Sequence, residues 1–230
     1  MTFKNSNRLL LALPPAELKR FTTDLEPISF PARHQLYEQG QAMSRVFFPT
    51  TAVVSMATVL EEGGMAEVAT VGNEGMLGIP VFLGVDRAVA RSIVKMAGDA
   101  LVMPTDVFKE ALSMSPTLHH LVGRYSFALL VQITRSGGCA AHHSLEERCA
   151  RWLLMMLDRA QGAEYPLPQE VVAEALGASR PRVNKALGGF QRAGLITLGR
   201  ARVLIVDRKR LEQKACECYR TIRNELGETS

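Results

Sequence analysis

The chain has 230 residues, of which 47% are hydrophobic and 22% charged, with a formal net charge of +4 at pH 7. This length suits two domains, and the composition is that of an ordinary soluble protein with enough apolar residues to bury its cores. No run approaches the roughly 18 apolar residues of a membrane span, and the apolar stretch near the N-terminus is too short for a secretory signal peptide. We therefore expect a cytoplasmic protein that makes no membrane contact.

The N-terminal half predicts a β-rich domain. Residues 9–25 predict one or two short helices, interrupted by a pair of prolines. From Glu26 the sequence changes to short β-branched and aromatic runs, which glycine or proline interrupts at intervals of roughly ten residues. This pattern predicts an antiparallel barrel or roll. Gly63 and Gly64 lie between two such runs and predict a hairpin turn, because glycine accepts positive φ.

A long helix is predicted after the roll. Thr105 is a candidate N-cap for a helix over 106–114, and Ser115-Pro116 opens a longer one. Apolar residues recur along it at steps of three or four, as in a coiled-coil seam. We expect the seam to join two copies of the chain, although a helix packed on its own domain is the alternative. Gly137-Gly138 predicts the end or a kink of the helix and an interdomain hinge. The expected seam consists of Leu118, Val122, Tyr125, Leu129 and Ile133.

The C-terminal part carries the excess positive charge. Through His143 there are 12 basic and 12 acidic residues, and from Ser144 onward there are 15 and 11. Between Ser179 and Arg210, nine basic residues stand against Asp207 alone. Such a local excess suits a polyanion, since neutralising phosphates releases counterions.

Residues 168–192 predict two short helices joined by a tight turn. The first has one apolar face and ends at Gly177. Ser179 is a candidate N-cap for the second, whose apolar stripe leaves the polar residues of its first turns outside. A helix-turn-helix has this arrangement, and its second helix enters the major groove of DNA. The alternative is a solvated helical hairpin with its charges outside.

The flanking segments complete this domain. A helix with a capping box at Ser144 and Glu147 precedes the pair, and a short hairpin follows it as a basic wing. Asp207 is a candidate cap for a final helix over 208–226. Arginine pairs with guanine, asparagine with adenine, and lysine with guanine or phosphate. The candidate DNA-binding residues are Gln169, Ser179, Arg180, Arg182, Asn184 and Lys185, with Arg200 and Arg202 in the wing.

Four cysteines, Cys139, Cys149, Cys216 and Cys218, offer sulfur chemistry. Cys149 falls on an apolar helical face and is expected as a buried thiol. Cys216 and Cys218, placed on one terminal helix, cannot both face one metal comfortably and lack a second ligand pair, so no metal site is expected. A redox role for the thiols stays open. The histidine pairs at 119–120 and 142–143 can each offer one ligand to a metal or heme, but polar surface or dimer contact is the expected role.

The order of roll, long helix, capped helix, helix-turn-helix and basic wing resembles the cAMP receptor protein and FNR (Crp/Fnr) family of bacterial transcription regulators over nearly the whole chain. The most specific segment is 167–196. Within it Gln169, Glu170, Gly177, Ser179, Arg180, Val183, Leu187, Leu195 and Ile196 match the family pattern. The resemblance implies base-reading or phosphate-contacting roles for Arg180 and Lys185. The side chain of Pro181 has no hydrogen-bond acceptor. Arg182 is therefore expected to supply the base contact that is missing at Pro181.

This resemblance implies an α+β chain in three parts. Residues 1–114 would form a cyclic-nucleotide-binding-like antiparallel β-roll (a jelly-roll barrel), 115–138 a dimerisation helix and hinge, and 139–230 a winged helix-turn-helix domain. It also implies a homodimer that binds a palindromic operator in double-stranded DNA and contacts RNA polymerase.

The effector site is where the chain departs from the family. There, backbone amides, a glutamate and an arginine hold a cyclic nucleotide. The nearest equivalents here are Gly78 and the pair Arg91-Ser92, which are the candidate effector-binding residues. Ile79 stands at the glutamate position and Pro80 removes an amide donor, so cAMP is not the expected effector.

Other classes of function are disfavoured by the sequence. No cysteine precedes Cys139, so the N-terminal iron-sulfur centre of some family members is not expected. The rival interpretation is an enzyme or ligand-binding adaptor that uses the barrel pocket and whose winged domain contacts protein. We find no nucleophile elbow, P-loop, dinucleotide fingerprint or zinc spacing, so we expect no enzyme. The sequence leaves open the effector, the operator, and activation versus repression.

Overall fold

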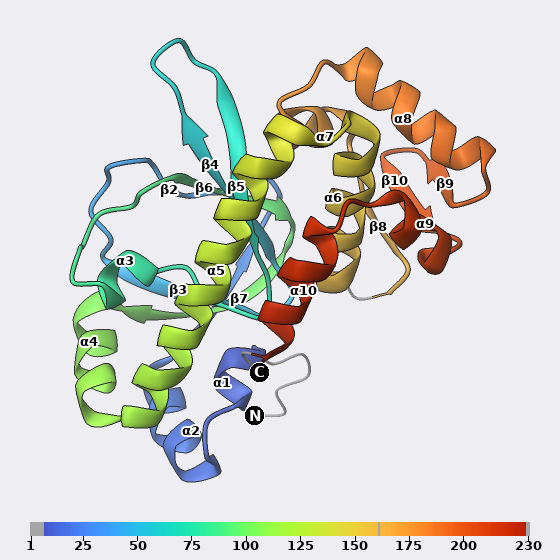
Figure 1. Cartoon of the computed structure of the whole chain (residues 1–230). Helices are drawn as coiled ribbons and strands as arrows, with labels where there is room; N and C mark the ends of the chain where they lie inside the picture. Colours follow the sequence, from blue (N-terminus) through green and yellow to red (C-terminus); the bar gives the residue numbers. More distant parts are fainter. Residues whose placement is uncertain (1–6, 161, 229–230) are drawn as a thin grey trace.

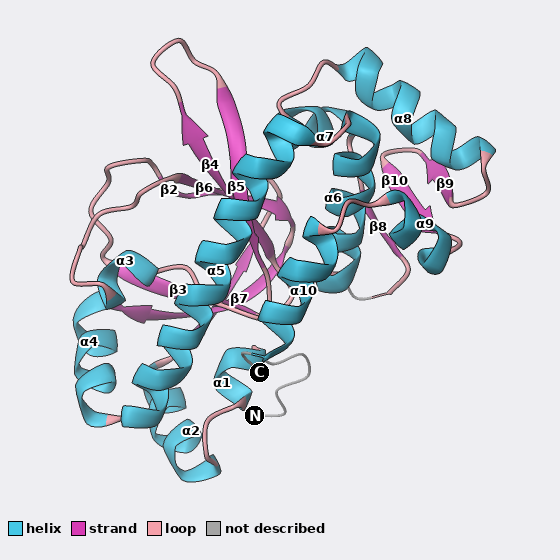
Figure 2. Cartoon of the chain, viewed as in Figure 1, coloured by secondary structure: helices cyan, strands magenta, loops and turns pink. Residues whose placement is uncertain are grey.

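The computed structural model describes residues 7–160 and 162–228 of the chain. It places a β-roll on one side of a long helix and a mostly helical C-terminal domain on the other (Figures 1 and 2). The predicted α+β class, with an N-terminal roll and a C-terminal helix-turn-helix, is confirmed. Within the described ranges, no helix combines the length and the hydropathy needed to cross a membrane.

Two antiparallel sheets form the roll, with strand orders β1-β7-β3 and β2-β6-β4-β5. The turn of the β4–β5 hairpin is the predicted one: Gly63 has φ +81°, and the Leu60 amide donates to the Gly64 carbonyl at 2.8 Å. The strands are β1 (Glu26–Phe30), β2 (Gln35–Tyr37), β3 (Arg45–Pro49), β4 (Val53–Val59), β5 (Met65–Val71), β6 (Arg91–Met96) and β7 (Gly98–Pro104).

Short helices close the roll. They are α1 (Arg8–Leu11), α2 (Pro15–Phe21), the 3₁₀ turn η1 (Thr22–Asp24), α3 (Ile79–Phe82) and α4 (Thr105–Met114). Thr105 is not the N-cap of α4 but its first helical residue, because its hydroxyl donates instead to the Met43 carbonyl at 2.6 Å. α3 begins after Gly78, where φ is +135° and an added Cβ would lie 2.5 Å from Val46. Only glycine fits there.

The long helix α5 (Pro116–His142) begins as predicted, since the Ser115 hydroxyl accepts a hydrogen bond from the Leu118 amide at 2.9 Å. Its predicted end is wrong. The helix passes through Gly137-Gly138 and ends at His142. A glycine inside a helix costs only about 1 kcal/mol relative to alanine, and the packing of the last helix against α5 offsets that cost.

The predicted dimer seam on α5 is buried within the same chain. Four of its members are between 0 and 5% exposed and belong to the main core, and the fifth, Ile133, is half-buried against it. The helix has apolar residues on more than one face, and the roll covers the face that the seam occupies. The four buried members are Leu118, Val122, Tyr125 and Leu129. The exposed apolar side chains of α5 are instead Phe127 and Leu130, at 59% and 58%.

The C-terminal domain holds the predicted helix pair and wing, together with a third strand, β8, that the sequence did not predict. The capping box of Ser144 and Glu147 is present. The helix predicted over 208–226 is broken, because Ala215 has extended backbone, φ −79° and ψ 150°. The elements are α6 (Leu145–Arg159), β8 (Glu164–Pro166), α7 (Gln169–Leu176), α8 (Arg180–Arg192), β9 (Ile196–Gly199), β10 (Arg202–Ile205), α9 (Arg208–Lys214) and α10 (Cys218–Glu228).

The C-terminal domain is docked on the roll. Buried apolar residues of both halves form one continuous cluster. Inside the interface, Arg159 of α6 lies 2.6 Å from Glu74, and their side chains are only 4% and 5% exposed. Trp152 of α6 also donates from Nε1 to Glu67 of β5 at 2.8 Å. The roll and the helix-turn-helix therefore share buried polar contacts as well as a common core.

Candidate nucleic-acid interface

The helix pair α7–α8 is held by the apolar pattern that the sequence predicted. α7 ends at Gly177, which adopts the left-handed conformation with φ +57° and ψ +41°. In α8, Val183 and Leu187 are fully buried and Phe190 is 1% exposed. This stripe packs α8 against α6. One side of α8 is thus fixed by the core, and the other is left to solvent.

The N-terminal half of α8 presents polar side chains to solvent. Ser179 occupies the N-cap position as predicted, but its side chain makes no capping hydrogen bond. Gln169 lies at the start of α7, beside the beginning of α8. All the candidate residues of this pair are exposed: Gln169, Ser179, Arg180, Arg182, Asn184 and Lys185.

The predicted wing is the hairpin of β9 and β10, which contacts α8. Its turn contains Arg200 and Ala201, and Ala201 has φ +56°. Arg200 and Arg202 are both exposed. Arg202 forms an ion pair with Glu164 of β8 at 2.5 Å, so its guanidinium is already partly neutralised. Arg200 is therefore the better placed of the two to meet a phosphate.

Glu170 connects α8 to the roll, a link that sequence reasoning missed. One of its carboxylate oxygens lies 3.3 Å from Nη2 of Arg180, and the other lies 2.6 Å from Nη2 of Arg33. Arg33 belongs to the turn between β1 and β2, where its φ is +69°. Because 137 residues separate Arg33 from Glu170, no local sequence signal could have found the pair.

An apolar cavity of about 400 Å³ lies between the roll and α5. Two of the three candidate effector-binding residues, Gly78 and Ser92, line it. None of the described residues that line it is charged. Its walls are mostly methionine, leucine, isoleucine and valine, and they include Phe127 and Leu130. A site of this kind favours an apolar ligand over an anion.

The third candidate, Arg91, is not part of that lining. Its Nε lies 3.0 and 2.9 Å from the two carboxylate oxygens of Glu38, and its Nη2 lies 2.8 Å from the second. This hydrogen bonding lowers the pKa of Glu38 and raises that of Arg91. Both groups therefore stay charged and paired at neutral pH.

Comparison with known proteins identifies similar sequences. Residues 147–214 match a Crp-like helix-turn-helix domain. The chain is 26% identical over 210 residues to the CRP-like cAMP-activated global transcriptional regulator of Mycobacterium tuberculosis (strain CDC 1551 / Oshkosh), covering 87% of this chain and 93% of that protein. It is 43% identical over 61 residues to the HTH-type transcriptional regulator Cmr of the same organism, covering 26% and 25%.

Solved structures share the fold. FixK2 from Bradyrhizobium japonicum aligns with a TM-score of 0.73 over 84% of this chain and 98% of its own, at 15% identity. The similarity therefore includes the roll, the long helix and the C-terminal domain together.

Proposed function

We propose, from the premise that this chain is a DNA-binding transcription regulator of the Crp/Fnr family, that the exposed N-terminal half of α8 reads operator bases as part of a homodimer. The observation that carries the proposal is the seating of α8: its apolar stripe is buried while Arg180, Arg182, Asn184 and Lys185 are exposed together. Two such helices one DNA turn apart fit successive major grooves of a palindromic operator. The protein acts in the cytoplasm and has no catalytic role.

The test of this proposal is Arg180→Ala. Because a bidentate arginine–guanine contact discriminates by about 1–3 kcal/mol, we expect the variant to lose about that much affinity for a duplex selected from a random pool by the natural protein. Its affinity for a scrambled duplex should change much less. Gel-shift titration of both duplexes measures the difference.

Arg192→Ala is the matched control, because Arg192 is exposed at the other end of the same helix and the charge change is identical. We expect this control to weaken both duplexes alike, as the loss of a phosphate contact does. If the two variants discriminate between the duplexes equally well, the assignment of α8 as the reading helix is wrong.

The dimer surface that we propose replaces the predicted seam. On the outer face of α5, Phe127 and Leu130 are exposed, and the exposed Gly137, beside which nothing lies within 4 Å of an added Cβ, allows a second helix to approach closely. A two-fold dimer would use this face twice, so each contact occurs in both copies. The proposed junction between the two domains moves to His143 and Ser144, directly after α5.

Leu130→Glu should separate the dimer. A charge buried without a partner is costly, and the two-fold axis doubles that cost. We expect the dimer dissociation constant to rise at least about tenfold, which corresponds to roughly 1.4 kcal/mol. Sedimentation equilibrium measures it.

Leu60→Glu is the control, because Leu60 at the β4–β5 hairpin tip is exposed to the same 58% as Leu130. It should leave the dissociation constant unchanged. Equal dissociation of the two variants would remove the outer face of α5 from the interface.

We further propose that the cavity beside α5 does not respond to cAMP, although the Mycobacterium tuberculosis relative is described as cAMP-activated. A cyclic phosphate needs a positive partner, and Arg91 is already held by Glu38. Phe127 and Leu130 line both the cavity and the proposed dimer surface. An apolar molecule bound there would alter the shape of that surface directly. RNA polymerase is the expected protein partner of the DNA-bound dimer.

A further inference from the structure

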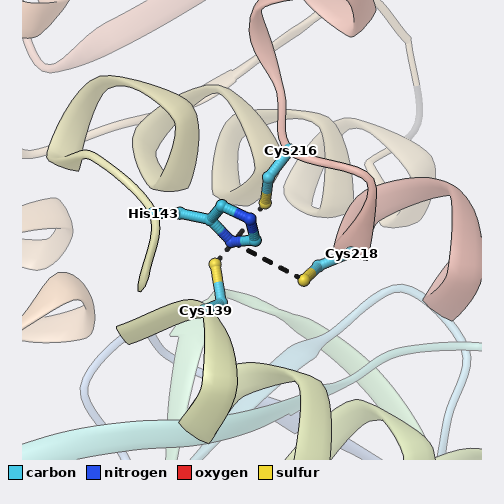
Figure 3. A group of neighbouring side chains, drawn as sticks. All are labelled: Cys139, His143, Cys216 and Cys218. Carbon is cyan, nitrogen blue, oxygen red and sulfur yellow. Dashed lines mark hydrogen bonds between the residues drawn. The ribbon is translucent and has the colours of Figure 1, made fainter. Parts of the chain in front are cut away.

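Three cysteines and one histidine converge where α5 meets α10 (Figure 3). Cys139 lies in the last turns of α5 and His143 directly after it. Cys216 lies in the break between α9 and α10, and Cys218 is the first residue of α10. The sulfur atoms and one ring nitrogen all lie within 4.8 Å of one another. The three cysteines are between 1 and 5% exposed and form a cluster separate from the main core.

The distances fit the edges of a tetrahedron around one ion. Sγ of Cys139 is 3.5 Å from Sγ of Cys216, and Sγ of Cys218 is 3.8 Å from Nδ1 of His143. A tetrahedral zinc with bonds of about 2.3 Å to sulfur and 2.0–2.1 Å to nitrogen separates its ligand atoms by about 3.5–3.8 Å. These two distances, together with the 4.8 Å that bounds all the others, place the four ligand atoms around one position for an ion.

The imidazole of His143 is oriented as a metal ligand. Its Nδ1 points toward the thiols, while its Nε2 lies 3.3 Å from a carboxylate oxygen of Glu217. A carboxylate on the outer nitrogen holds the proton there and leaves the inner lone pair free. Metal-bound histidines carry such a partner almost without exception. This arrangement is independent of the sulfur geometry and indicates the same ion.

A buried cation lies close to the sulfur atoms. Arg151 of α6 is 8% exposed, and its Nε has no hydrogen-bond partner among the described residues. Its guanidinium is close enough to act electrostatically on the Cys139 thiol. A zinc ion with three thiolates and a neutral imidazole carries a net charge of −1, which the guanidinium would balance.

We propose that Cys139, His143, Cys216 and Cys218 form a structural Cys₃His zinc site that ties the C-terminal helix to the long helix. All four protein positions around the ion are filled, as in structural rather than catalytic zinc sites. No metal site was expected from the sequence, because Cys216 and Cys218 were predicted on one continuous helix. The extended backbone at Ala215 breaks that helix and turns both thiols to the same side.

Metal analysis of the tag-free protein, purified with neither chelator nor added metal, tests this proposal without any DNA. We expect inductively coupled plasma mass spectrometry to find one zinc per chain. After removal of zinc under reducing conditions, addition of Co²⁺ should give the intense visible bands of tetrahedral cobalt and the near-ultraviolet absorption of thiolate bound to cobalt. Chelation should also lower Tm, because a ligand that binds only the folded state stabilises it.

Variants locate the ion. Cys218→Ser should abolish the cobalt–thiolate spectrum or reduce it strongly, whereas Cys149→Ala should leave it intact, because Cys149 is buried in the main core outside the cluster. Glu217→Gln should keep the ion but weaken zinc affinity about 10–100-fold, as expected of a partner that only orients the histidine. Since Glu217 is largely exposed, this variant is expected to fold normally.

Three results would overturn the proposal. One is that the reduced protein, after dialysis against Zn²⁺, does not retain one zinc per chain, and that its cobalt form gives an octahedral spectrum. Another is a metal-free protein in which Cys139 and Cys216 are joined by a disulfide, which would make the cluster a redox pair. Zinc lost equally from Cys149→Ala and Cys218→Ser would place the ion elsewhere in the chain.

Discussion

Replacing Arg159 by alanine is expected to lower the free energy of unfolding by about 3–5 kcal/mol, because removing one partner of a buried ion pair strands the other charge. The Glu74 side chain would remain inside the domain interface at 5% exposure, without the guanidinium that lies 2.6 Å away. The same arginine also donates to the Thr70 carbonyl at 3.1 Å, so β5 loses a contact with α6 as well. Urea unfolding followed by circular dichroism measures the change.

Lys109→Ala is the matched control for that experiment. Lys109 and Asp86 are also 2.6 Å apart, but their side chains are 45% and 51% exposed. Exposed pairs contribute about 0–1 kcal/mol, so this variant should unfold close to the natural protein. Similar small losses in both variants would show that the Arg159 pair is solvated and that it does not fix the domains together.

Phe190→Ala should cost about 3–5 kcal/mol, the usual range for removing a buried aromatic ring. Phe190 lies in the last turn of α8 and is 1% exposed. The cavity left by the lost ring would lie between α8 and the core. We expect operator affinity to fall as well, although the ring touches no DNA, since the reading side chains depend on a fixed helix. Unfolding and gel-shift measurements on one preparation test both effects.

Gln191→Ala provides the comparison, because Gln191 is the next residue and is exposed. It should change neither stability nor affinity by more than about 0.5 kcal/mol. Should Phe190→Ala bind operator as tightly as this control does, the seating of α8 on its apolar stripe would have no bearing on recognition.

Local signals in the sequence predicted much of this fold. The N-cap hydrogen bond of Ser115 and the capping box of Ser144 each join residues three positions apart. A short stretch of sequence therefore contains both partners of each cap. The glycine turns at Gly63 and Gly177 are local as well. The apolar stripe of α8 was predicted for the same reason, because helical spacing alone defines it.

The face that α5 turns inward could not be predicted in this way. The helix carries apolar residues on two sides, and periodicity does not say which side meets the roll. Tyr125 and Leu129 are buried, while Phe127 and Leu130, one or two positions away, are exposed. Only the position of the sheet decides between them, and that depends on contacts distant in sequence.

The cysteine cluster was missed for a related reason. Cys139 and Cys216 are 77 residues apart, and their approach depends on the packing of α10 on α5. No proline or glycine stands at Ala215, so the sequence carries no signal for a break in the helix there. The ligands come from two short pairs, Cys139 with His143 and Cys216 with Cys218, and only tertiary packing brings the two pairs together.

Under the proposed role of Arg180 in reading operator bases, Glu170 couples the roll to the DNA. Its carboxylate is shared by Arg33 and Arg180, so an operator guanine that draws Arg180 away removes a competitor for Arg33. By reciprocity, a movement of the β1–β2 turn that withdraws Arg33 leaves the Glu170 carboxylate to Arg180 alone. Arg180 is then held more tightly by Glu170, and the operator complex is weakened. Each such exposed pair contributes only about 0–1 kcal/mol, so this coupling can adjust occupancy of a promoter by a few fold without changing the fold of either domain.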